Sequence, residues 1–186
     1  LSLVTSGGTR RWLARPLFLA AGLLPFLFTG PFTELKPSPY KGLSQALQVS
    51  GARIVGERSG PLGLLTVVES PRIPFRHAPG LSVLNPSEPP EQLGVFTDGG
   101  GFTVINRHDA RGEAPRYLDF LTSALPYYLL RRPSVLVIGT GGGTEVLQAV
   151  FLQARRIDAL EVNAQMAPLI QEYYAAFSGP LYHRQA

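Results

Sequence analysis

The chain has 186 residues, 45% of them hydrophobic and 16% charged, and it carries a formal net charge of +4. It contains no cysteine, which excludes disulfides, thiolate metal sites and a cysteine nucleophile. The basic residues are scattered, so we expect no nucleic-acid-binding surface, and the three histidines lack the spacing of metal ligands, so we expect no metal site.

An apolar segment occupies residues 1–32, and its run from Leu17 to Phe28 carries no charge. That run is shorter than the roughly 20 apolar residues of a lone membrane span. Residues 12–32 therefore fit a secretory signal, the last part of a membrane region that contacts lipid, or a segment packed on the next domain. The sequence does not decide between the cytoplasm and the cytoplasmic face of a membrane.

Residues 33–110 are expected to form a small domain rich in β-hairpins. Two β-branched runs, 51–58 and 62–69, flank a Ser-Gly-Pro turn and predict the first hairpin. After a proline-rich loop, 93–97 and 102–105 flank Asp-Gly-Gly-Gly and predict the second. Two hairpins bury little alone, so they must pack on other parts of the chain or on a partner. Both a β cap without chemistry and a lid over a substrate fit this pattern.

Residues 117–130 show apolar side chains at helical spacing, which predicts a helix. Pro126 is expected to kink or restart it. The residues expected to line its apolar face are Leu118, Leu121, Ala124 and Leu125.

The segment 133–163 carries the strongest pattern. Residues 134–138 read SVLVI, which predicts a strand buried on both faces, as in a parallel sheet. The glycine-rich loop 139–144 follows, then a predicted helix at 145–154 and a second strand at 157–162. This order is the unit that binds nucleosides at the carboxyl end of a strand. It predicts an α/β fold with a doubly wound, Rossmann-like sheet.

The loop and the second strand offer groups suited to a nucleoside. Glycines let the backbone approach a ligand, and the N-terminus of the next helix presents free N–H groups. Glu161 stands at the end of the predicted second strand, where a carboxylate can accept hydrogen bonds from both ribose hydroxyls. Thr144 stands where a dinucleotide site has its third glycine, and no Walker Gly-Lys-Ser/Thr is present. An adenosyl sulfonium compound bound by a methyltransferase-type fold is the remaining common ligand.

Several short segments together carry a family resemblance. They are SPYKGL (38–43), ARIVGERSGPLGLLTVVESP (52–71), TDGGG (97–101), YLDFL (117–121), VLVIGTGGG (135–143), ALEVN (159–163) and FSGPLY (177–182). On these segments, roughly over 33–186, the chain resembles the spermidine synthase family, the polyamine aminopropyltransferases. The likeness is greatest to the bacterial branch that has membrane helices before the synthase-like domain.

In that family the glycine-rich loop and the acid after the second strand hold decarboxylated S-adenosylmethionine or its thioether product. The resemblance implies this role for Gly139, Thr140, Gly141, Gly142, Gly143, Glu161 and Asn163. It implies a substrate role for Tyr117 and Asp119, which match a Tyr-His-Glu-like stretch in which Leu118 replaces the His. Gly142 stands where the family usually has Asp, and Lys41 where Gln often follows Tyr, and these departures concern the polyamine more than the adenosyl group.

The resemblance also implies that 111–186 is only the first part of an adenosyl-binding domain. The family's catalytic Asp follows the fourth strand, so we expect the base beyond residue 186 and an inactive chain by itself. It would take a proton from an amine that attacks the carbon next to the sulfonium. We further expect weak adenosyl binding and self-association, because an incomplete sheet leaves half a crevice and an exposed edge.

Three functions stay open from the sequence. The first is an aminopropyltransferase that uses decarboxylated S-adenosylmethionine and a small amine such as a polyamine. The second is another S-adenosylmethionine-dependent enzyme, such as a methyltransferase. The third is a non-catalytic, synthase-like module for assembly or membrane attachment, which the departures at Leu118 and Gly142 favour.

Overall fold

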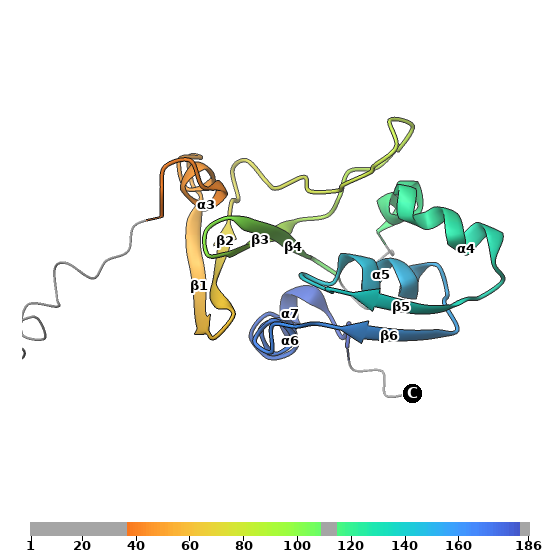
Figure 1. Ribbon diagram of the computed structural model, residues 1–186. Helices are drawn as coiled ribbons and strands as arrows, with labels where there is room; N and C mark the ends of the chain where they lie inside the picture. Colours follow the sequence, from red (N-terminus) through yellow and green to blue (C-terminus); the bar gives the residue numbers. More distant parts are fainter. Residues whose placement is uncertain (1–36, 109–114, 183–186) are drawn as a thin grey trace, which may run out of the picture. The chain divides into compact units, whose positions relative to one another are not determined.

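The computed structural model describes residues 37–108 and 115–182, which lie in one compact unit (Figure 1). The fold is mixed α/β, with a four-stranded antiparallel sheet and a two-stranded parallel sheet. The elements in chain order are α3 (Gly42–Ala46), β1 (Arg53–Gly60), β2 (Gly63–Glu69), β3 (Gln92–Thr97), β4 (Gly101–Asn106), the 3₁₀ helices η1 (Arg116–Phe120) and η2 (Thr122–Ala124), α4 (Leu125–Leu129), β5 (Ser134–Ile138), α5 (Thr144–Phe151), β6 (Arg156–Leu160), α6 (Met166–Pro168), the π-helical turn η3 (Leu169–Tyr173) and α7 (Ala175–Ser178).

The apolar segment 12–32 and its three interpretations lie outside the described residues. Within 37–108 and 115–182, no helix combines the length and the apolar character needed to cross a membrane.

Both predicted hairpins are confirmed. β1 pairs antiparallel with β2, and β3 pairs antiparallel with β4. β2 also pairs with β3, so the two hairpins join into one sheet with the order β1-β2-β3-β4. The first turn is tighter than the sequence indicated, because Ser59 and Gly60 continue β1 and only Pro61 and Leu62 connect the strands.

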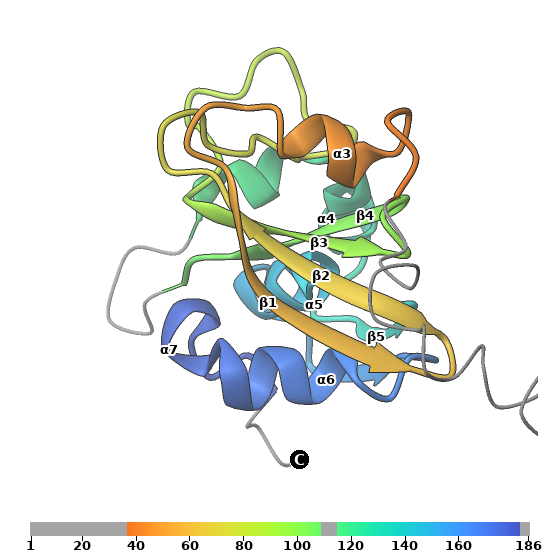
Figure 2. The same cartoon turned by 90° about the vertical axis from the view of Figure 1, so that its left-hand side faces the viewer.

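The four-stranded sheet has apolar packing on both faces, because alternate residues of a strand point to opposite sides. On one face, Leu65, Val67 and Val95 pack against the segment from Met166 to Ile170. On the other face, Val68 and Phe96 pack against Leu43 of α3. Figure 2 shows α3 on one side of the sheet and the α6–α7 segment on the other.

The predicted strand–loop–helix–strand order is also confirmed. β5 and β6 pair in parallel, from Ser134 opposite Arg156 to Ile138 opposite Leu160. The Gly139 N–H donates to the Leu160 carbonyl at 2.8 Å, which extends the ladder into the loop. The carboxyl ends of both strands therefore lie side by side where the glycine-rich loop begins.

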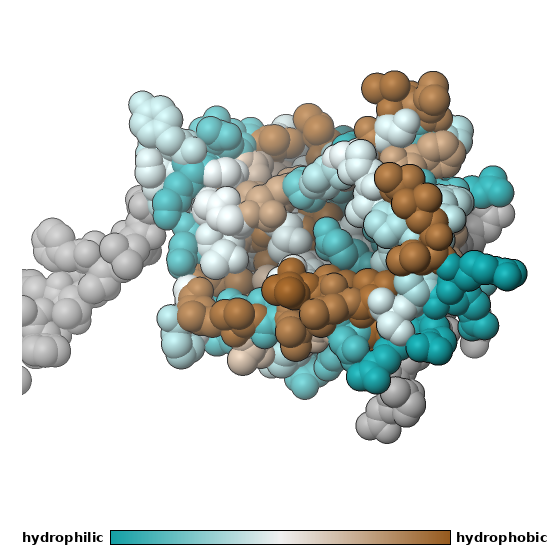
Figure 3. Space-filling view, turned by 45° about the vertical axis from the view of Figure 1, so that its right-hand side comes forward, coloured by the Kyte–Doolittle hydropathy of each residue, from teal (hydrophilic) through white to brown (hydrophobic). Residues whose placement is uncertain are grey.

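The prediction that residues 134–138 are buried on both faces is wrong. Only Val137 is buried, while Leu136 is 57% and Ile138 76% exposed. Leu136 and Ile138 point away from α5, and Leu160 of β6 continues the same exposed face. Figure 3 shows hydrophobic side chains gathered at the surface in this region and over α4. The apolar sequence suits a covered strand, but within the described residues this face has no covering element.

The predicted helix at 117–130 is also wrong in its continuity. Two 3₁₀ helices come first, and α4 starts only at Leu125, with Pro126 in its first turn. The break falls at Leu121, which is extended and forms an isolated bridge with Leu81. Leu118, Leu121 and Ala124 are buried as expected, but Leu125 is 61% exposed because the α-helix restarts there.

His77 lies against the four-stranded sheet, where its ring meets Phe102 edge-on with 4.8 Å between the ring centroids. Burial lowers the pKa of His77 below its ordinary value of 6.5, and the nearby Glu145 carboxylate opposes this shift in part. The folded protein therefore resists protonation of this ring more than the unfolded chain does.

We predict that the free energy of unfolding falls as the pH is lowered from about 7.5 to about 5, and that part of this fall belongs to His77. Below the unfolded pKa of about 6.5 the unfolded chain takes up a proton that the folded ring resists. Urea unfolding across this pH range should show a smaller fall for His77→Phe, which keeps an aromatic ring without a titrating group. An unchanged pH dependence in the variant would contradict the assignment.

Candidate functional site

The glycine-rich loop between β5 and α5 needs left-handed backbone. Gly141 has a φ of +48°, and a Cβ there would lie 2.8 Å from the Thr103 hydroxyl oxygen. Gly143 caps α5 with a φ of +90°, and its carbonyl accepts the Leu147 N–H at 2.9 Å. Glycine adopts these conformations without the steric cost of a Cβ.

Strand β4 approaches the loop at Gly142. The Gly142 N–H donates to the Thr103 hydroxyl oxygen at 2.9 Å. A Cβ at Gly142 would overlap the backbone carbonyl of Val104. A larger residue, including an aspartate, therefore has no room at position 142 in this arrangement. Glycine at position 142 therefore has a steric reason in this chain.

Glu161 holds the loop from the opposite side. Its Oε2 accepts the Gly141 N–H at 2.9 Å, and the Thr140 hydroxyl lies 3.4 Å from the same oxygen. Its Oε1 accepts the N–H of Asn163 at 2.9 Å. The side chain is half-buried, so the carboxylate organises the backbone around it while part of it stays accessible.

A cleft of about 440 Å³ opens beside this carboxylate. Its walls come from the glycine-rich loop, the residues between β6 and the start of α6, and the turn ends of both hairpins. The lining residues are Leu62, Thr97, Gly101, Phe102, Thr103, Gly141, Glu161, Val162, Asn163 and Met166. The cleft therefore combines apolar walls with a polar corner at the carboxyl ends of β5 and β6, which is where open α/β sheets bind ligands.

Of the predicted site residues, Gly141, Glu161 and Asn163 line this cleft. The other predicted residues are not among its lining residues: Gly139, Thr140, Gly142, Gly143, Tyr117 and Asp119. The Tyr117 side chain is fully buried, and its hydroxyl donates to Asn106 Oδ1 at 2.9 Å. The Asp119 carboxylate accepts the Tyr128 hydroxyl. Neither residue is among those that line the cleft.

Tyr117 instead belongs to a buried polar network that supports the loop. Asn106 Oδ1 also accepts the Gln92 amide at 2.9 Å, and Asn106 Nδ2 donates to the Thr144 hydroxyl at 2.9 Å. Burial raises the pKa of Tyr117 far above its ordinary value, with the Glu145 charge acting in the same direction. The neutral phenol thus acts as a hydrogen-bond donor to Asn106. Asn106 in turn holds the hydroxyl of Thr144, the first residue of α5.

Several residues that build the site were not foreseen from the sequence. Thr103 and Asn106 lie on β4, and Met166 begins α6. Asn106 and Gln92 are buried polar residues at paired positions of β3 and β4. A polar residue at the inward-facing end of an otherwise apolar hairpin is the signal that could have singled them out.

Comparisons of the chain with protein-family models, with curated protein sequences and with solved structures found no match. Over the described ranges 37–108 and 115–182, no group of three or more His, Asp or Glu side chains is placed to hold a metal ion.

We predict that Gly142→Ala destabilises the protein by about 2 kcal/mol or more, because the added methyl group forces β4 away from the loop. Urea unfolding measures the effect. Gly100→Ala is the matched control, because a Cβ there lies no closer than 4.0 Å to another atom, and it should cost less than about 1 kcal/mol. Equal stability of the two variants would show that the loop and β4 do not make this contact.

We predict that Tyr117→Phe lowers the free energy of unfolding by about 1 kcal/mol, because Asn106 loses one buried hydrogen bond while the ring packing stays. Tyr40→Phe serves as control, since Tyr40 is 90% exposed and its variant should stay within about 0.5 kcal/mol of the wild type. A Tyr117→Phe protein as stable as the control would argue against the network.

Proposed function

We propose that the cleft binds the adenosyl group of S-adenosylmethionine or its decarboxylated form, and that 111–186 belongs to a Rossmann-like, methyltransferase-type domain. The observation that carries the proposal is the hydrogen bond from the Gly141 N–H to Glu161 at 2.9 Å, beside a cleft that both residues line. This hydrogen bond joins the glycine-rich loop to Glu161, the two features from which the sequence predicts nucleoside binding.

The Glu161 carboxylate can accept further hydrogen bonds from a ribose. An ionised carboxylate has about four acceptor positions. In Glu161 two of them are used by the Gly141 and Asn163 N–H groups, and the Thr140 hydroxyl lies at the longer distance of 3.4 Å. One position therefore remains on Oε1, and a ribose hydroxyl reaches Oε2 by displacing the long hydrogen bond from Thr140. The hydrogen bonds from the loop hold the carboxylate in place before a ligand arrives.

The size and walls of the cleft suit a nucleoside. Its volume of about 440 Å³ lies within the usual range of about 300–1,000 Å³ for small-molecule sites. Phe102, Met166 and Val162 offer apolar surface for a base or a thioether, next to the polar corner at Glu161. A cationic sulfonium would also be favoured by the negative charge of this carboxylate.

The reaction class that fits such a ligand is group transfer from the sulfonium to a small-molecule amine, as in the aminopropyltransferases that the sequence resembles. The amine attacks the carbon bonded to sulfur, the carbon–sulfur bond breaks, and the thioether leaves with the bonding pair. A base must take the amine proton. Glu161 is the one carboxylate among the described lining residues, and its oxygens already accept backbone N–H groups, so we assign it to binding rather than to proton transfer.

A non-catalytic module is the second candidate, and one observation favours it. Tyr117 and Asp119 are the residues expected to meet the amine substrate, and both are engaged in bonds within the protein, to Asn106 and Tyr128. In this alternative the α/β segment keeps its loop for structural reasons and serves in assembly.

We predict that methylthioadenosine binds weakly and perturbs the backbone amide signals of Gly139–Gly143, Glu161 and Asn163. Titration followed by two-dimensional NMR detects such binding. Glu161→Gln should weaken it about tenfold or more, because a neutral amide offers one acceptor oxygen in place of a charged pair.

Two controls separate recognition of the ribose from general effects. The variant Glu145→Gln removes an exposed carboxylate on α5 that does not line the cleft, and it should leave the binding unchanged. The wild type should bind the 2′-deoxy analogue more weakly than methylthioadenosine. In Glu161→Gln the difference in affinity between these two ligands should be smaller. Amide shifts that are absent or lie elsewhere at millimolar ligand would reject the proposed site.

A further inference from the structure

The fold gathers four arginines at the end of the parallel sheet where β5 and β6 begin. They form two pairs that are far apart in the sequence, Arg131 with Arg132 and Arg155 with Arg156. The Arg155 N–H donates to the Pro133 carbonyl at 2.9 Å, and Ser134 stands opposite Arg156 at the start of the ladder. The connection into β5 therefore lies beside the connection into β6, and each carries one pair.

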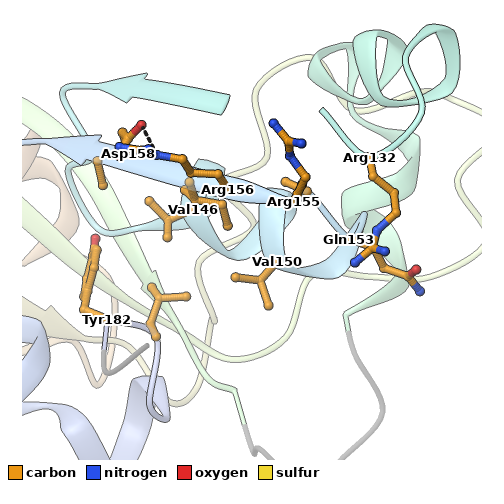
Figure 4. Close-up of a pocket in the computed structure, with 12 residues that line it drawn as sticks. Arg132, Val146, Val150, Gln153, Arg155, Arg156, Asp158 and Tyr182 are labelled. Atoms are coloured by element: carbon orange, nitrogen blue, oxygen red, sulfur yellow. Dashed lines mark hydrogen bonds and ion pairs between the residues drawn. The ribbon is translucent and has the colours of Figure 1, made fainter. Parts of the chain in front are cut away.

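This group of four residues, the arginine end of the sheet, is exposed and strongly positive. In Figure 4, Arg132 and Arg155 lie near Gln153 at the same end of the strands. Asp158 is the one carboxylate in 125–138 and 151–160, and its ion pair with Arg156 at 2.9 Å balances one charge. The other three arginines form no ion pair with a described residue. Like charges held together repel one another, so an anionic partner is favoured at this end.

Exposed leucines stand next to the arginines. Leu129 ends α4 and is 73% exposed, and the next residue, Leu130, is 57% exposed. Figure 3 brings this side of the molecule forward and shows hydrophobic side chains over α4 beside strongly hydrophilic ones. Basic side chains that reach phosphate groups, next to aliphatic side chains that enter the acyl boundary, are typical of protein surfaces that bind at a membrane interface.

We propose that the arginine end docks on a membrane surface that contains anionic phospholipids. Guanidinium groups bind phosphate through paired N–H donors. Leu129 and Leu130 then lose their contact with water at the interface, which adds a favourable hydrophobic term. Nucleic acid is a less suitable partner, because a nucleic-acid surface gains from aromatic side chains that stack on bases, whereas these leucines gain from lipid.

A membrane at this end leaves the cleft open to water. The cleft includes Gly141 and Glu161 at the carboxyl ends of β5 and β6, whereas the arginines lie at the amino ends. A strand that joins an edge of such a sheet, or a helix that covers one of its faces, leaves the amino ends of β5 and β6 at the surface. The docking surface is separate from the cleft, so this proposal stands or falls independently of the proposed function.

Co-sedimentation of the purified 186-residue chain with lipid vesicles tests the docking surface. Residues 12–32 are apolar and can bind any vesicle, so the quantity compared is the ratio of the affinities for vesicles with phosphatidylserine and for vesicles of phosphatidylcholine alone. The wild type should prefer phosphatidylserine, and added salt should reduce the preference. The double variant Arg132→Asn with Arg155→Gln should bind phosphatidylserine vesicles at least about tenfold more weakly, at about fivefold for each arginine.

Two features of the design keep the comparison specific. Position 132 has a left-handed backbone with a φ of +47°, which asparagine tolerates better than most residues. The matched control is Arg53→Gln with Arg72→Gln, because it removes the same net charge from two exposed arginines near the first hairpin. The control should keep the wild-type preference, and circular dichroism verifies that each variant is folded.

A second double variant, Leu129→Ser with Leu130→Ser, separates lipid from nucleic acid. It should bind phosphatidylserine vesicles at least about fivefold more weakly and leave any binding to double-stranded DNA unchanged. Equal wild-type affinity for the two kinds of vesicle overturns the proposal, as does a preference that the arginine variant retains. DNA that binds more tightly than the vesicles, through the arginines and without the leucines, overturns it in favour of nucleic acid.

Discussion

The close approach of β4 to the glycine-rich loop is the constraint on which the rest of the site depends. Gly142 lies so near the Val104 carbonyl that a Cβ would overlap it, and its N–H is fixed by Thr103. From the other side, Glu161 accepts the N–H of Gly141. The loop is thus held between the hairpin sheet and the end of β6, and the space left beside it is the cleft. The glycines are needed here first for packing, and a ligand would use a geometry that the fold already imposes.

The same contacts explain why the polar groups of the cleft suit the binding of a ligand better than the transfer of protons. Tyr117 is turned into the core to donate to Asn106, and Asn106 in turn contacts Thr144 at the start of α5. A phenol used in this way stabilises the loop and is withdrawn from any substrate. The polar corner that remains belongs to Glu161 and the backbone, a combination suited to holding a ribose rather than to moving protons. The proposed binding of an adenosyl group and the alternative of non-catalytic assembly therefore rest on the same structural basis.

The sequence predicted those parts of the structure that depend on local pattern. The β-branched runs, the turn residues between them, and the apolar run before the glycine-rich loop led to the two hairpins and the parallel pair. It failed where long-range packing decides. The bridge between Leu81 and Leu121 breaks the expected helix. The buried Tyr117 hydroxyl donates to Asn106 at the end of β4, and this contact between two elements is not visible in the local sequence pattern. Leu136 and Ile138 have the composition of a covered strand, yet cover requires a neighbour that their own sequence does not specify.

A crystal structure of the protein soaked with methylthioadenosine tests the central claim most directly, because it locates the ribose relative to Glu161. We expect both ribose hydroxyls within hydrogen-bond distance of the Glu161 carboxylate, about 2.5–3.0 Å between oxygens, with the Gly141 N–H still bonded to Oε2. A nucleoside bound elsewhere, or a Glu161 side chain that turns away from the loop when the ligand binds, would contradict the claim that this carboxylate is a preorganised ribose acceptor.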